Sequence, residues 1–176
     1  MTAHRRRVSN IGDISEVHYT LAVMNATDWD ALIPELKQWN NGAGIDADGW
    51  RSCFGNFQLA CAYSLLFWPR FTELDDMVFR GEMTRERLES WKANCSSEPA
   101  TIEATANHIH IADVQYVGCP DLSVERVIYL GNLLREIYQV KLAAEFPTRK
   151  FVVDFYEPPD RKLSEYQVTF YQRNDS

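Results

Sequence analysis

The chain contains none of the short motifs that mark common catalytic or cofactor sites. It has no GxxxxGK[ST] or GxGxxG phosphate-binding loop and no GxSxG nucleophile turn. Its four cysteines include no CxxC pair, the spacing that zinc knuckles and thioredoxin-like redox sites use. These absences predict a protein that binds no cofactor, and they favour a protein that is not an enzyme.

Long apolar segments are also missing. The most apolar run covers residues 59–68 and is closed by Pro69, whereas a membrane-crossing helix needs about 20 such residues. The opening residues, MTAHRRRVSN, lack the apolar stretch of a secretory signal. We therefore expect a soluble cytoplasmic protein with reduced cysteines and no contact with a membrane.

The bulk composition is that of an ordinary globular protein. Of the 176 residues, 45% are hydrophobic and 24% are charged, which suffices for a core that needs no disulfide or metal. We predict a single domain over residues 14–176, since chains of this length usually form one domain. A flexible basic arm at residues 1–13, which contains the consecutive arginines Arg5, Arg6 and Arg7, is expected to precede it.

Acidic residues outnumber basic ones, 25 against 18, and the net charge is −7. An acidic surface repels the phosphates of nucleic acids and favours a basic protein partner. Nucleic-acid binding through the arm at Arg5–Arg7 is therefore the least favoured function. The sequence leaves the oligomeric state open.

Apolar periodicity predicts an α+β fold, with about five helices packed against a small, mostly antiparallel sheet. Alternating segments at 17–23, 151–156 and 166–171, and a short apolar run at 77–79, are typical of strands. The segment Glu157–Asp160 contains two prolines and must be a connection, because proline cannot donate to a strand ladder. The last two strands are therefore expected to form a C-terminal β-hairpin.

Thr27, Thr84 and Ser123 are expected to cap helices, and Pro34 should interrupt the first of them. The segment 50–68 gives the clearest helical pattern. Its apolar residues recur every three or four positions, and its second half is apolar nearly all round. A helix without a polar face must be covered on most sides. We therefore expect one continuous helix at the centre of the fold.

The most suggestive chemical segment contains two of the four histidines, His108 and His110, followed by Asp113. On a strand, residues two apart share a face, so both histidines could bind one metal ion. On a helix they point about 200° apart and could not. The apolar spacing that begins after Pro99 favours the helix, in which the histidines have a structural role.

Two functions follow from these patterns. The favoured one is a non-enzymatic protein-binding module, for example an immunity- or antitoxin-like inhibitor of a basic partner. The alternative is a small metal-dependent hydrolase centred on His108, His110 and Asp113, with Glu103 or Asp113 as the base. The tyrosines of the predicted hairpin are candidates for an interface: Tyr156, Tyr166 and Tyr171.

Overall fold

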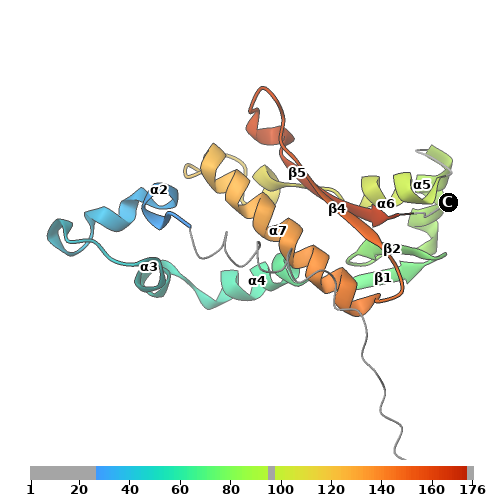
Figure 1. Ribbon diagram of the computed structural model, residues 1–176, viewed down its shortest axis with the longest axis horizontal. Helices are drawn as coiled ribbons and strands as arrows, with labels where there is room; N and C mark the ends of the chain where they lie inside the picture. Colours follow the sequence, from blue (N-terminus) through green and yellow to red (C-terminus); the bar gives the residue numbers. More distant parts are fainter. Residues whose placement is uncertain (1–26, 95–97, 174–176) are drawn as a thin grey trace, which may run out of the picture. The chain divides into compact units, whose positions relative to one another are not determined.

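The computed structural model describes residues 27–94 and 98–173 (Figure 1). The basic arm at 1–13 and the strand predicted at 17–23 lie outside these residues. The chain divides into two compact units, residues 1–49 and 50–176. A compact unit is not by itself an independently folding domain, so the single domain over 14–176 stays a prediction.

In the first unit, short helices surround one buried side chain. Helix α2 (Trp29–Leu32) begins after Asp28 and not after the predicted cap Thr27, because the Asp28 carboxylate accepts a hydrogen bond from the Ala31 N–H at 3.0 Å. Proline then starts a separate 3₁₀ helix, η1 (Pro34–Gln38), which contains the buried Leu36. The predicted interruption at Pro34 is thus confirmed, because proline cannot donate the hydrogen bond that would continue α2.

The second unit is an α+β structure, as predicted. Its elements follow in the order α4 (Phe57–Phe67), β1 (Phe71–Leu74), β2 (Met77–Arg80), α5 (Arg85–Asn94), α6 (Pro99–Ala106), β3 (Ile109–His110), η3 (Ile111–Val114), α7 (Val124–Glu145), β4 (Phe151–Tyr156), η4 (Leu163–Glu165) and β5 (Gln167–Gln172). Strands β1 and β2 form one antiparallel sheet, and a second has the order β3-β5-β4. The predicted C-terminal hairpin is β4–β5, which is antiparallel.

The main core lies between the long helix α7 and the β4–β5 hairpin, which run side by side in Figure 1. Val153 and Phe155 of β4 pair in register with Phe170 and Val168 of β5, so these four side chains share one face of the sheet. They pack against three fully buried residues of α7: Leu134, Tyr138 and Leu142.

Helix α6 connects the two sheets through polar side chains. The fully buried Glu103 accepts hydrogen bonds from the backbone N–H of Val78 on β2 at 2.7 Å and from that of Gln172 on β5 at 2.6 Å. One turn later, Asn107 donates to the carbonyls of Val78 at 2.9 Å and Phe170 at 3.2 Å. These side chains take the place of a strand ladder between β2 and β5.

The prediction for residues 50–68 is wrong on two points. The segment forms two helices, α3 (Ala47–Phe54) and α4, separated at Gly55 and Asn56. The Asn56 side chain accepts a hydrogen bond from the Leu59 N–H at 2.8 Å and so starts a new helix. Neither helix contains a buried residue. The core forms around α7 instead, and only the half-buried Leu66 and Phe67 of α4 pack against it.

The helix expected from Pro99 onward is shorter than its apolar spacing suggests. It ends at Ala106, and Ile109 and His110 form strand β3, which pairs with β5. The side chain of Asn107 ends the helix, because its hydrogen bonds to β2 and β5 hold it at the strand edges. The strand interpretation of the histidine segment therefore applies.

Among residues 27–94 and 98–173, no helix combines the length and the apolarity needed to cross a bilayer.

Candidate functional site

A cavity of about 500 Å³ in the second unit is lined by both apolar and polar side chains. Helix α4 provides most of the apolar ones, with Leu59, Ala62, Leu65 and Leu66. The polar side chains come from α4, the end of β2, the approach to β3, and η3 with the residue after it: Tyr63, Arg80, His108, His110, Asp113 and Gln115. The cavity therefore contains three of the four predicted chemical residues.

Strand geometry brings the two histidines together. Ile109 pairs with Val168 of β5 and turns into the core, so the residues on either side of it face the opposite way. The rings of His108 and His110 lie 5.2 Å apart between centroids, nearly perpendicular to each other, and both line the cavity.

The two imidazoles have different surroundings. Nδ1 of the exposed His108 lies 2.5 Å from the Thr105 carbonyl oxygen, so it carries the proton of that hydrogen bond. In the neutral ring this leaves Nε2 as an acceptor. Nδ1 of the half-buried His110 is shielded from solvent, and no described residue forms a hydrogen bond with it.

Arg80 brings a positive charge to the cavity. Its backbone N–H donates to the Asn107 side chain at 2.8 Å, which holds the end of β2 in place. Its Nε is buried, and no described residue accepts a hydrogen bond from it. Burial raises the pKa of the Tyr138 hydroxyl to about 12, and the positive charge of Arg80 acts in the opposite direction.

Tyr63 and Gln115 close one end of the cavity. The Gln115 side-chain amide donates to the Tyr63 hydroxyl, which ties the segment after η3 to α4. Burial raises the pKa of Tyr63, and the nearby charges of Asp121 and Cys119 raise it further.

The Cys119 thiol, which lies outside the cavity lining, donates to the Asp121 carboxylate at 2.7 Å, and this bond raises the thiol pKa. Such a thiol is less reactive than a free one.

Asp113 is the only carboxylate on the cavity wall among the described residues, and its side chain is exposed. In the described part of the chain, no group of three or more His, Cys, Asp or Glu residues is placed to hold a metal ion. The cavity therefore offers a pair of imidazoles, a guanidinium and one carboxylate as its ionisable groups, together with the Tyr63 hydroxyl.

The fourth predicted residue, Glu103, does not line this cavity. Both of its carboxylate oxygens are occupied by the bonds to β2 and β5, and Gln172 adds a third bond through its side-chain amide at 2.8 Å. Burial raises the pKa of Glu103, while the hydrogen bonds from Gln172 and Val78 and the charge of Arg149 act in the opposite direction. The structure therefore places Glu103 as a link between the sheets.

The three hairpin tyrosines lie in different environments. Tyr156 is 43% exposed, Tyr171 is half-buried, and Tyr166 is only 1% exposed. Tyr166 stacks near Phe155 within the core, with ring centroids 6.1 Å apart. Tyr166 is thus a core residue and differs from the surface position that an interface requires.

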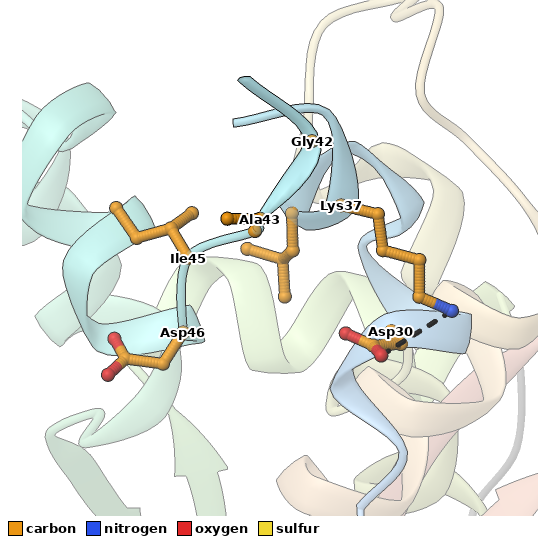
Figure 2. Close-up of a pocket in the computed structure, with 8 residues that line it drawn as sticks. Asp30, Lys37, Gly42, Ala43, Ile45 and Asp46 are labelled. Atoms are coloured by element: carbon orange, nitrogen blue, oxygen red, sulfur yellow. Dashed lines mark ion pairs between the residues drawn. The ribbon is translucent and has the colours of Figure 1, made fainter. Parts of the chain in front are cut away.

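A second hollow, in the first unit, has a volume of about 420 Å³ (Figure 2). Lys37 and Asp30 point toward each other across it and form an ion pair of 3.4 Å. Asp46 lies at its rim and accepts a hydrogen bond from the Gly49 N–H at 2.7 Å. The charged groups around this hollow therefore have partners within the unit, and it is the weaker candidate for a site.

Sequence reasoning missed Arg80, Tyr63 and Gln115, which no motif marks. Their roles depend on the packing of β2, α4 and η3, elements that are far apart in the chain. A local signal existed only for Arg80, which directly follows the predicted strand at 77–79. Comparison of the chain with known protein families, with curated protein sequences and with solved structures finds no match.

Proposed function

We propose that this protein is a non-enzymatic protein-binding module whose partner docks on helix α4. The observation that carries the proposal is an exposed set of large apolar residues, here called the α4 face. It consists of Phe57, 91% exposed, Leu65, 69%, and Trp68, 59%, which directly follows the helix. Single exposed apolar residues are normal, but a cluster of this kind on one element is typical of an interaction site.

The chemistry of the α4 face suits a protein partner. Large aromatic and aliphatic side chains contribute most of the binding energy in protein interfaces, and a polar rim surrounds them. Trp68 is already held in place, because the buried Lys141 ammonium lies 4.7 Å from the centre of its ring. An ordered aromatic side chain loses little conformational entropy on binding.

Charge favours a basic partner. The net charge is −7, and two carboxylates lie beside the α4 face. Asp113 lines the same cavity as Leu65, and Glu145 pairs with Lys141 under Trp68. Complementary charges speed association and select the partner. An immunity- or antitoxin-like inhibitor works in this way, since it blocks its target by surface contact.

The test is a binding measurement with matched variants. A basic protein captured at low salt from the source cells is purified, and its affinity is measured by calorimetry. The double variant Phe57→Ser/Leu65→Ser should bind at least about tenfold more weakly, because each lost apolar anchor contributes about 1.5–3 kcal/mol. Val140→Ser, which changes an exposed residue on α7, should leave the affinity unchanged. Equal affinities for all three proteins, or no basic protein recovered at any salt concentration, would rule the proposal out.

The alternative function, a small metal-dependent hydrolase, has one observation in its favour. His108, His110 and Asp113 line one cavity, with the imidazole rings 5.2 Å apart. A metal bound there would activate water, with Asp113 as the nearby base. Metal analysis of the purified protein decides the matter. Stoichiometric zinc, manganese or iron that His110→Ala removes would favour the hydrolase, and a metal-free protein with no thermal shift on metal addition would exclude it.

A further inference from the structure

The cavity beside α4 contains a positive charge that no described residue neutralises. The Arg80 guanidinium forms no ion pair within residues 27–94 and 98–173, and its Nε is buried without a hydrogen-bond partner. A buried donor without an acceptor costs about 1–3 kcal/mol, and more if it is charged. The neighbouring His110 Nδ1 is buried and unpartnered in the same way. These two atoms are themselves shielded from solvent, so an acceptor from outside the chain would bind the other N–H groups of the guanidinium, which lines the cavity.

The net charge of the wall limits what that acceptor can be. Arg80 contributes one positive charge and Asp113 contributes one negative charge, with His108 and His110 as further donors or acceptors. Asp113 repels a dianion such as phosphate about twice as strongly as a monoanion. A monoanion with two oxygens matches the guanidinium, which binds carboxylates through paired N–H groups.

Apolar side chains line the same cavity. Leu59, Ala62, Leu65 and Leu66 come from α4, so a ligand that fills the cavity meets hydrocarbon as well as charge. A volume of about 500 Å³ lies within the range of sites for small organic molecules. A simple inorganic anion would leave these apolar side chains uncovered.

We propose that this cavity binds a small monocarboxylic acid that carries an apolar group. The carboxylate accepts hydrogen bonds from Arg80 and His110, and the apolar group packs against Leu59, Ala62 and Leu66. The cavity shares Leu65 with the α4 face, so the test below uses the protein without a protein partner, and its failure would leave the docking proposal standing. The cavity also shares His110 with the metal site of the alternative function, and Arg80 opposes a cation at this place.

The experiment uses octanoate as the probe, titrated into the full-length protein in EDTA so that no metal can bridge the carboxylate to the histidines. Saturable binding is expected by calorimetry below about 10 mM, the range in which weak small-molecule sites saturate. Octanamide has the same chain without the charge, and acetate has the charge without the chain. Both should bind at least about tenfold more weakly, because each lacks one half of the interaction. Inorganic phosphate should not bind.

Variants connect the binding to the cavity. Arg80→Gln should weaken octanoate binding about tenfold or more, whereas Arg87→Gln, on the exposed surface of α5, should not change it. Ala62→Phe, at an exposed position of α4, should block the cavity without affecting the core. The Ala62→Phe variant therefore tests the cavity even if Arg80→Gln fails to fold. Equal binding of octanoate and octanamide, preferential binding of phosphate, no saturation, or unchanged affinity in Ala62→Phe would each overturn the proposal.

Discussion

The Glu103 carboxylate of α6 accepts a hydrogen bond from the backbone N–H of Val78, on β2, at 2.7 Å. In a continuous sheet, the carbonyl of a neighbouring strand would accept that bond. On the side of β2 away from β1, the next strand is β5, which belongs to the other sheet, and the second oxygen of Glu103 accepts a hydrogen bond from its Gln172 N–H at 2.6 Å. A single side chain thus satisfies the facing edges of two sheets, and the stability of the unit should depend on it.

Glu103→Gln tests this link and its charge. The amide can accept from one backbone N–H but not from both, so the free energy of unfolding should fall by about 1–3 kcal/mol. Burial raises the pKa of Glu103 above its ordinary value of 4.5, so the folded protein retains a proton that the unfolded chain has lost. The stability that this group contributes is present below pH 4.5 and decreases as the pH rises through the raised value.

Urea unfolding between pH 4 and pH 8 measures both effects. The stability difference between the wild type and Glu103→Gln should be largest at the acid end and should shrink as the pH rises. Glu82→Gln, at an exposed position after β2, is the control and should give a difference near zero across the range. A difference that grows with pH would show that Glu103 is stabilised as a carboxylate.

Asn107 should be as important as Glu103. Its side chain satisfies three backbone groups, the Val78 and Phe170 carbonyls and the Arg80 N–H. Asn107→Leu keeps the size but leaves all three unpaired, so we expect a loss of about 3 kcal/mol or more in chemical denaturation. The Arg80 amide should also exchange faster with deuterium. Asn94→Leu, at the exposed end of α5, should have little effect, and equal losses for both variants would contradict the bridging role.

Gly131 allows α7 to approach the sheet closely. A Cβ atom at this position would overlap Cε2 and Cζ of the Phe155 ring, on β4. Gly131→Ala should therefore destabilise the protein by about 1–3 kcal/mol, although alanine favours helices by about 1 kcal/mol. Adding Phe155→Leu should recover part of the loss in thermal denaturation. Gln139→Ala, on the exposed side of α7, should be neutral, and a neutral or stabilising Gly131→Ala would refute the close contact.

Tyr138 connects α4 to the core through a hydrogen bond. Its hydroxyl donates to the Leu66 carbonyl at 2.8 Å, and burial raises its pKa to about 12. Tyr138→Phe should cost about 1 kcal/mol. Because the folded pKa exceeds the ordinary value of 10.0, the wild type should lose stability between pH 10 and pH 12.

The variant Tyr138→Phe should lose less stability over that alkaline range than the wild type. Denaturation at pH 9, 10 and 11 gives the comparison. Tyr156→Phe, at an exposed position of β4, provides the control and should follow the wild type. If both variants behave alike, the hydrogen bond to Leu66 contributes nothing to the attachment of α4.

Local signals in the sequence predicted the elements well where a single side chain decides the boundary. Thr84 and Ser123 accept hydrogen bonds from the N–H groups three residues later, as expected of helix caps. The hairpin followed from strict alternation and the two prolines between its strands. The break before α4 had a visible signal too, since asparagine at position 56 is a favoured cap.

What could not be predicted depends on contacts between distant residues. Apolar spacing extended the helix after Pro99 to Ile109, but the bonds of Asn107 to β2 and β5 stop it earlier. The two histidines lie close together in the sequence and could be found there. Arg80 reaches the same cavity from β2, far away in the chain, so the sequence did not connect it with them. The exposure of α4 also escaped prediction, because periodicity reports how apolar a helix is and not what covers it.

The position of β5 in the sheet has a consequence for synthesis. This strand lies between β3 and β4, and it also supplies the Gln172 and Phe170 backbone groups that α6 binds. Until residues 167–172 have left the ribosome, β3 and β4 lack the strand that pairs with both of them. The apolar residues of α7 that pack against β5 stay exposed to solvent during that time. A nascent chain that stalls before this point would be a substrate for chaperones rather than a folding intermediate.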